Sequence, residues 1–143
     1  MSATTFGVLI VSECEDDSAL ADLVLRQAYP EAVVLVVTDA LEFADRLAAG
    51  AFSVAIVDET LSWADGVAVF QAIERRYPTC AGLLLTSRFD GTEPPEPIDV
   101  VVPKSSRGFV RLPSALERAR RFRRARSYQD VHAGAYWGVF SLN

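Results

Sequence analysis

Five short apolar runs, separated by stretches of helical periodicity, constrain the fold of this chain more than any other feature. Each run is nearly continuous in hydrophobicity, which is typical of a strand buried on both faces of a parallel sheet. The runs occupy residues 6–11, 32–37, 53–58, 81–86 and 98–102. Parallel strands need crossover connections, which helices between the runs can supply. The sequence therefore predicts an α/β, doubly wound, five-stranded parallel sheet in the order 2-1-3-4-5.

Helical spacing of apolar residues fills most of the gaps between the runs. It occurs at residues 18–29, 39–49 and 66–77. The alternation breaks once, because residues 88–97 hold three prolines and a glycine, which disfavour a regular helix. We therefore expect the fourth helix of this arrangement to be missing or much shortened.

A long arginine-rich helix is predicted after the fifth run, opened by a capping box of Ser114 and Glu117. One side of it would be apolar, with Leu116, Ala119, Phe122 and Ala125. The arginines of this segment are Arg111, Arg118, Arg120, Arg121, Arg123, Arg124 and Arg126. They favour a solvated helix or the flank of a dimer seam over a nucleic-acid site.

Composition narrows the class of protein. The 143 residues are 50% hydrophobic and 23% charged, enough for one domain with a buried core. The net charge of −5 argues against nucleic acid as the partner. Only two cysteines, no apolar run of membrane length and no signal-peptide pattern predict a soluble, cytoplasmic protein without a membrane partner.

Polar side chains stand where four of the predicted strands end. They are Glu13, Asp58, Thr86 and Lys104. Because the carboxyl ends of parallel strands share one edge of the sheet, these side chains would converge at its switch point. Two carboxylates favour a divalent cation, and oxygen ligands suit Mg²⁺. A phosphoryl group there would meet Lys104 and the Thr86 hydroxyl, and Asp58 could be the nucleophile that forms an acyl phosphate.

This arrangement resembles the receiver domain of two-component response regulators, a CheY-like member of the flavodoxin-like folds. Residues 58–66 are similar to the family's phosphoacceptor aspartate with its loop and Asp-Gly turn. Thr86-Ser87 resembles the family's hydroxyl residue with its small neighbour, and Lys104 resembles its lysine. The resemblance implies a receiver domain over residues 1–127, with a histidine kinase or phosphotransfer protein as phosphodonor to Asp58.

The same resemblance implies Mg²⁺ as cofactor. Its ligands would be Glu13, Asp58 and the backbone carbonyl of Thr60, with Ser12 as a weak ligand through water. Ser12 stands where the family usually has a second carboxylate, so the metal affinity should be weaker by about 1 kcal/mol or more. Asp16 and Asp17 lie too far along the chain to replace that charge directly.

Two further departures from the family pattern affect how the domain would pass on a signal. Val101 replaces the usual aromatic residue of the fifth strand, and Pro103-Lys104-Ser105 replaces the usual Lys-Pro. The family signals through a face that includes its fourth helix, so signalling here should use the C-terminal helix, with a homodimer through that helix expected.

The last segment, residues 128–143, resembles the opening of a PAS sensor domain, with a short helix led by Tyr128 and a strand beginning at Gly138. The resemblance implies the N-terminal part of a larger receiver–PAS signalling protein, similar to a hybrid histidine kinase. No separate enzyme activity is expected beyond phosphorylation and dephosphorylation of Asp58, although the full-length protein could be a kinase. Alternatively, the tail folds back so that Trp137 and Phe140 cover an apolar patch.

Two other functions remain open. A pseudo-receiver would keep the fold as an interaction or dimerisation module with little or no phosphorylation. A phosphatase-like hydrolase is a weaker alternative, because it would need a general acid where Thr60 stands. Trp63, in the loop after Asp58, could gate access to that aspartate or pack on the loop.

Overall fold

The computed structural model describes residues 6–88, 91 and 93–141, with side chains described through Arg126. It contains a five-stranded parallel sheet in the order β2-β1-β3-β4-β5. The strands are β1 (Gly7–Val11), β2 (Val33–Val37), β3 (Val54–Asp58), β4 (Ala81–Thr86) and β5 (Val100–Pro103). The predicted fold class and strand order are therefore confirmed.

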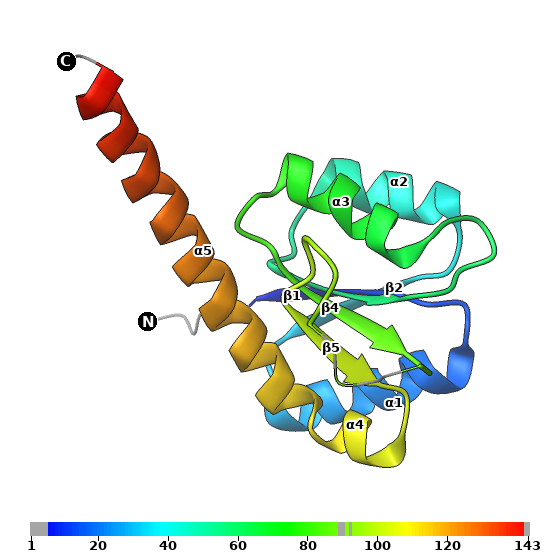
Figure 1. Cartoon of the computed structure of the whole chain (residues 1–143). Helices are drawn as coiled ribbons and strands as arrows, with labels where there is room; N and C mark the ends of the chain where they lie inside the picture. Colours follow the sequence, from blue (N-terminus) through cyan, green and yellow to red (C-terminus); the bar gives the residue numbers. More distant parts are fainter. Residues whose placement is uncertain (1–5, 89–90, 92, 142–143) are drawn as a thin grey trace.

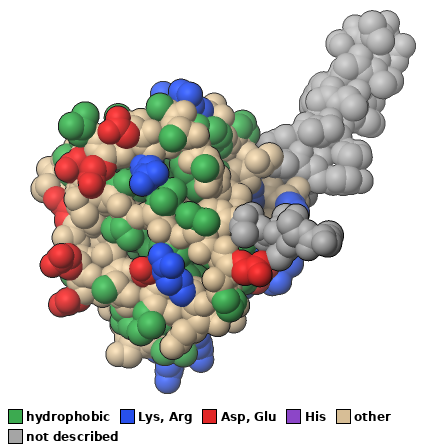
Figure 2. Space-filling model, turned by 180° about the vertical axis from the view of Figure 1, so that it is seen from behind, with side chains coloured by type: hydrophobic (Ala, Val, Ile, Leu, Met, Phe, Trp, Pro, Cys, Tyr) green, Lys and Arg blue, Asp and Glu red, His purple; other side chains and the backbone are tan. Residues whose placement is uncertain are grey.

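Helices cover both faces of the sheet (Figure 1). On one face lie α2 (Ala40–Ala49) and α3 (Gly66–Arg76). On the other lie α1 (Glu15–Ala28), α4 (Ser106–Val110) and the first part of α5 (Leu112–Ser141). Seen from behind, most of the visible acidic side chains gather toward one edge of the body (Figure 2), so the acidic side chains are unevenly spread over this face.

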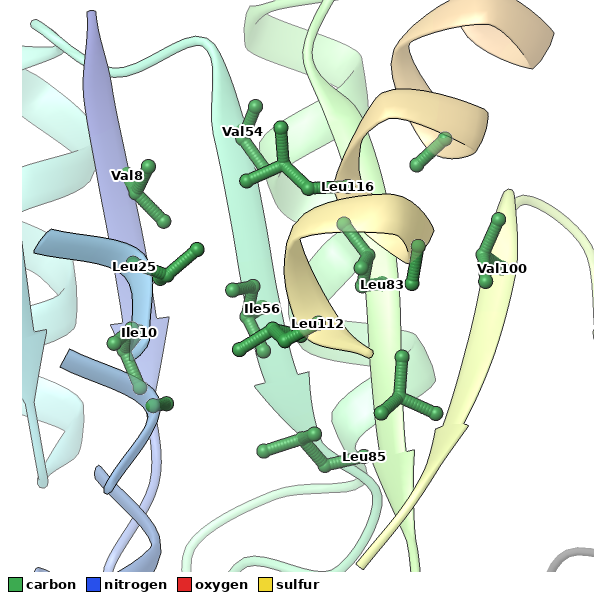
Figure 3. Packing of buried hydrophobic residues seen from close by; sticks show 14 of the residues in the cluster. Val8, Ile10, Leu25, Val54, Ile56, Leu83, Leu85, Val100, Leu112 and Leu116 are labelled. Carbon is green, nitrogen blue, oxygen red and sulfur yellow. The ribbon is translucent and has the colours of Figure 1, made fainter. Parts of the chain in front are cut away.

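Two buried clusters follow directly from the alternation of side chains along each strand. In β3, Val54 and Ile56 point to the α1/α5 face, whereas Ala55 and Val57 point to the α2/α3 face. Figure 3 shows Leu112 and Leu116 of α5 lying over β3 and β4 within the first cluster. Because both faces are covered, the strands carry continuous apolar runs, as the sequence suggested.

The connection between β4 and β5 contains no helix in its described residues, 87–88, 91 and 93–99. The expected loss of a helix at this point is confirmed. A short helix that the sequence did not predict, α4, instead follows β5. The side chain of Ser105 caps it by accepting a hydrogen bond from the backbone N–H of Gly108 at 3.0 Å.

Helix α5 differs from its prediction in three ways. It begins at Leu112, so Ser114 is not its N-cap. Its apolar side is Leu112, Ala115, Leu116 and Ala119, while Phe122 is half exposed. Arg123 is buried among ion-pair partners and is not solvated as its neighbours are.

The backbone of α5 remains helical through Ser141 (Figure 1). The strand expected to begin at Gly138 is therefore wrong, because that residue lies inside the helix. The side chains of Trp137 and Phe140, which the sequence suggested could cover an apolar patch, lie outside the described residues. No helix in the described part of the chain is both long and apolar enough to cross a membrane.

Candidate functional site

The carboxyl edge of the sheet brings a buried carboxylate and an ammonium into direct contact. Asp58 ends β3 with its side chain 5% exposed, and its Oδ2 lies 2.6 Å from Lys104 Nζ. Its Oδ1 accepts a hydrogen bond from the backbone N–H of Thr60 at 3.2 Å. Burial of Lys104 acts to lower its pKa, but the hydrogen bond and charge of Asp58, together with the charge of Asp17, outweigh that effect and raise it.

Two glycines allow the loops that carry these groups to pack closely. At Gly66, a Cβ would lie 2.1 Å from the carbonyl oxygen of Asp58, so only glycine lets α3 start against the end of β3. At Gly108, a Cβ would lie 2.0 Å from the carbonyl oxygen of Pro103, which lets α4 fold back on the turn that holds Lys104. The Lys104 N–H also donates to the Thr86 carbonyl at 2.8 Å.

Asp17 also reaches this site. Helix α1 begins at Glu15 rather than Ser18, which places Asp17 in its first turn. The Asp17 Oδ2 lies 3.7 Å from Lys104 Nζ. From the sequence, Asp17 lies too far along the chain to replace the missing carboxylate directly, and its contact with Lys104 was not predicted. Its contact is with the lysine, so it adds negative charge to the site without replacing the carboxylate missing at Ser12.

The loop after β1 is tied to the loop after β3. Glu13 accepts a hydrogen bond from the backbone N–H of Ser62 at 2.5 Å with Oε1, and its Oε2 accepts from the Ser62 hydroxyl. These bonds lower the pKa of Glu13. Ser12 is fully buried, and its hydroxyl accepts from the Cys14 N–H at 3.2 Å.

Thr86 lies at the end of β4, and its hydroxyl both donates and accepts a hydrogen bond. Its Oγ1 donates to Glu59 Oε1 at 2.6 Å and accepts from the Arg88 N–H at 3.0 Å. Glu59 directly follows Asp58, and its own N–H donates to the Leu85 carbonyl at 2.8 Å. Glu59 was not predicted as a site residue, because nothing in a single sequence pairs it with a hydroxyl on another strand.

Trp63 packs on the loop. Its indole N–H donates to the Thr38 carbonyl at 3.1 Å, and its ring lies 5.8 Å from that of Phe43. An antiparallel bridge between Thr60 and Asp65 closes the same loop. The loop, Glu59 and Arg88 line an open depression of about 640 Å³. Trp63 is thus fixed in place, and the structure favours packing over gating.

The donor atoms at this edge have the chemistry of a weak Mg²⁺ site. Asp58, Glu13 and the Thr60 carbonyl offer only oxygen, which suits a hard cation. However, Ser62 holds both carboxylate oxygens of Glu13, and Lys104 holds one of Asp58. No group of three acidic, His or Cys side chains in the described residues could hold a metal. The residues fit Mg²⁺ only if Glu13 leaves Ser62.

A second buried charge cluster, which was not predicted from the sequence, joins α5 to the opposite edge of the sheet. Arg123 contacts Asp99 Oδ2 at 3.1 Å and Glu74 Oε2 at 2.5 Å, and donates to the Pro97 carbonyl at 2.7 Å. Asp99 also accepts from the Gly82 N–H at 2.8 Å. Burial raises the pKa of Asp99. The cluster fixes α5 against β4 and the loop that replaces the missing helix.

No model of a known protein family matches the sequence, and no curated protein sequence matches it. Solved structures do match the fold. A response regulator receiver protein from Sinorhizobium medicae aligns with a TM-score of 0.69 at 15% identity, covering 85% of this chain and 99% of that one. A chemotaxis response regulator from Vibrio cholerae aligns with a TM-score of 0.67 at 20% identity, covering 81% and 99%.

A third match is the N-terminal domain of a response regulator/sensory box/GGDEF three-domain protein from Carboxydothermus hydrogenoformans, with a TM-score of 0.68 at 19% identity. It covers 85% of this chain and 98% of that one. Together these likenesses show that the chain has the receiver-domain fold.

Proposed function

We propose that this chain, built on the receiver fold, is a phosphoacceptor receiver domain in which Asp58 takes up a phosphoryl group. The observation that carries the proposal is the contact of 2.6 Å between the buried Asp58 carboxylate and Lys104. A buried carboxylate with one cationic partner, at the carboxyl edge of an open parallel sheet, stands where such folds place their ligands. The same pair would be an expensive way to stabilise a fold, since burying charges is costly.

The chemistry proposed for this site is a phosphoryl transfer. A carboxylate oxygen of Asp58 attacks phosphorus of a phosphohistidine on a partner kinase or phosphotransfer protein. The P–N bond breaks, and the imidazole leaves with the electron pair and takes a proton from solvent. Lys104 then balances negative charge on the phosphoryl oxygens, and Thr86 can donate its hydroxyl to one of them.

Glu13, Asp58 and the Thr60 carbonyl would hold Mg²⁺, and Ser12 would contribute at most through water. When bound, the ion supplies charge neutralisation at the phosphoryl oxygens. The chain's own residues must first rearrange, since Glu13 has to release Ser62. We expect a low metal affinity for that reason.

A pseudo-receiver is the second candidate function. It is favoured by Ser12, whose hydroxyl is bonded within its own loop, and by Glu13, whose carboxylate is held by Ser62. Such a domain would act through its fold and through α5, without chemistry at Asp58.

The setting of the domain is also a proposal. Because the described residues between β4 and β5 form no helix, α5 is the element best placed to pass on a signal, and we propose that it forms a homodimer. A cytoplasmic location fits the two free cysteines. A receiver–PAS or kinase context is supported by the tail sequence and by the sensory-box neighbour, whereas the helix that continues through Ser141 in place of the expected strand does not support it.

Incubation of the chain with Mg²⁺ and acetyl phosphate, followed by intact-mass analysis, tests the main proposal. One phosphoryl adduct is expected on the wild type and none on Asp58→Asn. Asp65→Asn, which alters a carboxylate of the same loop, is the matched control and should keep the adduct. An unmodified wild type, under conditions that label an ordinary receiver, would favour the pseudo-receiver.

A further inference from the structure

The proposed phosphorylation of Asp58 does not explain why Thr86 donates a hydrogen bond to Glu59. Thr86 is 5% exposed, and its hydroxyl proton points to Glu59 Oε1 at 2.6 Å. A hydrogen bond to an ionised carboxylate is shorter and stronger than one between neutral groups. The backbone N–H of Arg88 supplies the other contact of the hydroxyl at 3.0 Å.

A threonine hydroxyl has one proton, so it can donate to one acceptor at a time. While Glu59 holds that proton, Thr86 cannot donate to a phosphoryl oxygen on Asp58. The backbone of Glu59 is held in place, because Asp58 pairs with Leu85 in the sheet and the Glu59 N–H donates to the Leu85 carbonyl. Glu59 and Thr86 are therefore held side by side by the registry of β3 and β4.

We propose that Glu59 is a positioning residue that holds the Thr86 hydroxyl in the unphosphorylated protein and must release it before Thr86 can bind the phosphoryl group. This inference rests on the proposed phosphorylation of Asp58. Phosphorylation would then have to overcome the Thr86–Glu59 hydrogen bond, because the phosphoryl oxygens and the Glu59 carboxylate compete for the one hydroxyl proton of Thr86. The open depression beside Glu59 gives that side chain room to turn away when it lets go.

The first test measures the rate of phosphorylation by acetyl phosphate in four proteins: wild type, Glu59→Gln, Thr86→Val and the double variant. Glu59→Gln keeps an acceptor oxygen but replaces a charge-assisted hydrogen bond by a weaker neutral one, so it should raise the rate roughly two- to fivefold. The increase should disappear in the Thr86→Val background. An equal increase in both backgrounds would mean that Glu59 acts only through its charge, and would overturn the inference. Glu31→Gln, which removes an exposed charge far along the chain, is the control for net charge.

The second test needs no phosphorylation, so it separates this inference from the proposed function. The same four proteins are unfolded thermally without phosphodonor. If Glu59 holds Thr86, the double variant should lose less in melting temperature than the two single variants lose together. Additive losses would contradict the hydrogen bond itself. If the losses in melting temperature are non-additive but the wild type forms no phosphoryl adduct, the Thr86–Glu59 contact is supported and the phosphoacceptor role is rejected.

Discussion

Lys104 Nζ lies 2.6 Å from Asp58 Oδ2, and Lys104 is the only lysine of the chain. Protein labelled with ¹³C-lysine should therefore give a single side-chain lysine signal, and its titration reports this one ion pair. The pKa of Lys104 should lie above its ordinary value of 10.5, because Asp58 and, less strongly, Asp17 outweigh the effect of partial burial. Asp58→Asn should lower the pKa, because Asp17 at 3.7 Å is then the only nearby carboxylate that offsets burial among the described side chains.

Asp16→Asn is the matched control for that titration, because Asp16 is exposed in the same turn of α1 as Asp17. It should leave the signal nearly unchanged. Since the folded-state pKa of Lys104 is raised, the pair stabilises the fold fully below pH 10.5 and loses this contribution as the pH rises through the folded-state value. A titration unaffected by Asp58→Asn would show that the ion pair does not exist in solution.

Arg123→Met should destabilise the protein strongly, by about 3–5 kcal/mol, because it removes the closest cation of the buried Asp99 carboxylate and leaves only Arg126 at 3.8 Å. Urea denaturation measures this change. Arg124→Met removes the same charge from the next, exposed position of α5, and should cost less than about 0.5 kcal/mol. Similar midpoints for the two variants would rule out the buried cluster as a major support of α5.

Ser62→Ala should tighten Mg²⁺ binding roughly three- to tenfold, since Glu13 loses one of the two donors that hold it. Trp63 lies next to Ser62, and its fluorescence provides a readout that does not depend on phosphorylation. Ser53→Ala, at the other end of β3, is the control and should not alter the titration. Weaker binding in Ser62→Ala would mean that Ser62 helps to place Glu13 for the metal.

Tyr29→Phe should make stability less sensitive to alkaline pH. The phenol donates to Glu117 Oε2 at 2.7 Å, and burial together with Glu117 raises the pKa of Tyr29 from 10.0 to about 12. The raised value means that the contribution of Tyr29 is complete below pH 10 and is lost as the pH rises toward 12. Denaturant midpoints compared between pH 9 and pH 12 should fall further for the wild type than for the variant. Parallel declines would show that Tyr29 ionises freely in the fold.

The order of the strands and the gathering of Asp58, Thr86 and Lys104 at one edge could be predicted, because continuous apolar runs report double burial and parallel strands share an edge. Element boundaries were harder. Ser114 matches a capping box, yet α5 begins earlier because Leu112 is buried in the core. Tertiary packing decided that boundary, and no local signal records it.

Side-chain partners were the least predictable part of the site. Glu59 finds Thr86 only because β3 and β4 pair in register, and Arg123 finds Asp99 across 24 residues of chain. In sequence, Arg123 is one arginine among seven in a polar segment. The periodicity of α5 even points to Phe122 as the more apolar choice, and that side chain is half exposed.

The continuity of α5 gives it the mechanics of a lever. Eighteen residues follow Arg123 before the helix ends at Ser141, a length of about 27 Å at 1.5 Å per residue. Arg123 is the last buried residue of α5 among the described side chains, so the part of the helix beyond it can pivot at this point. A tilt of about 5° there would carry the far end of the helix through roughly 2 Å. A small displacement of the β4–β5 edge would therefore produce a larger displacement at the C-terminal end of α5.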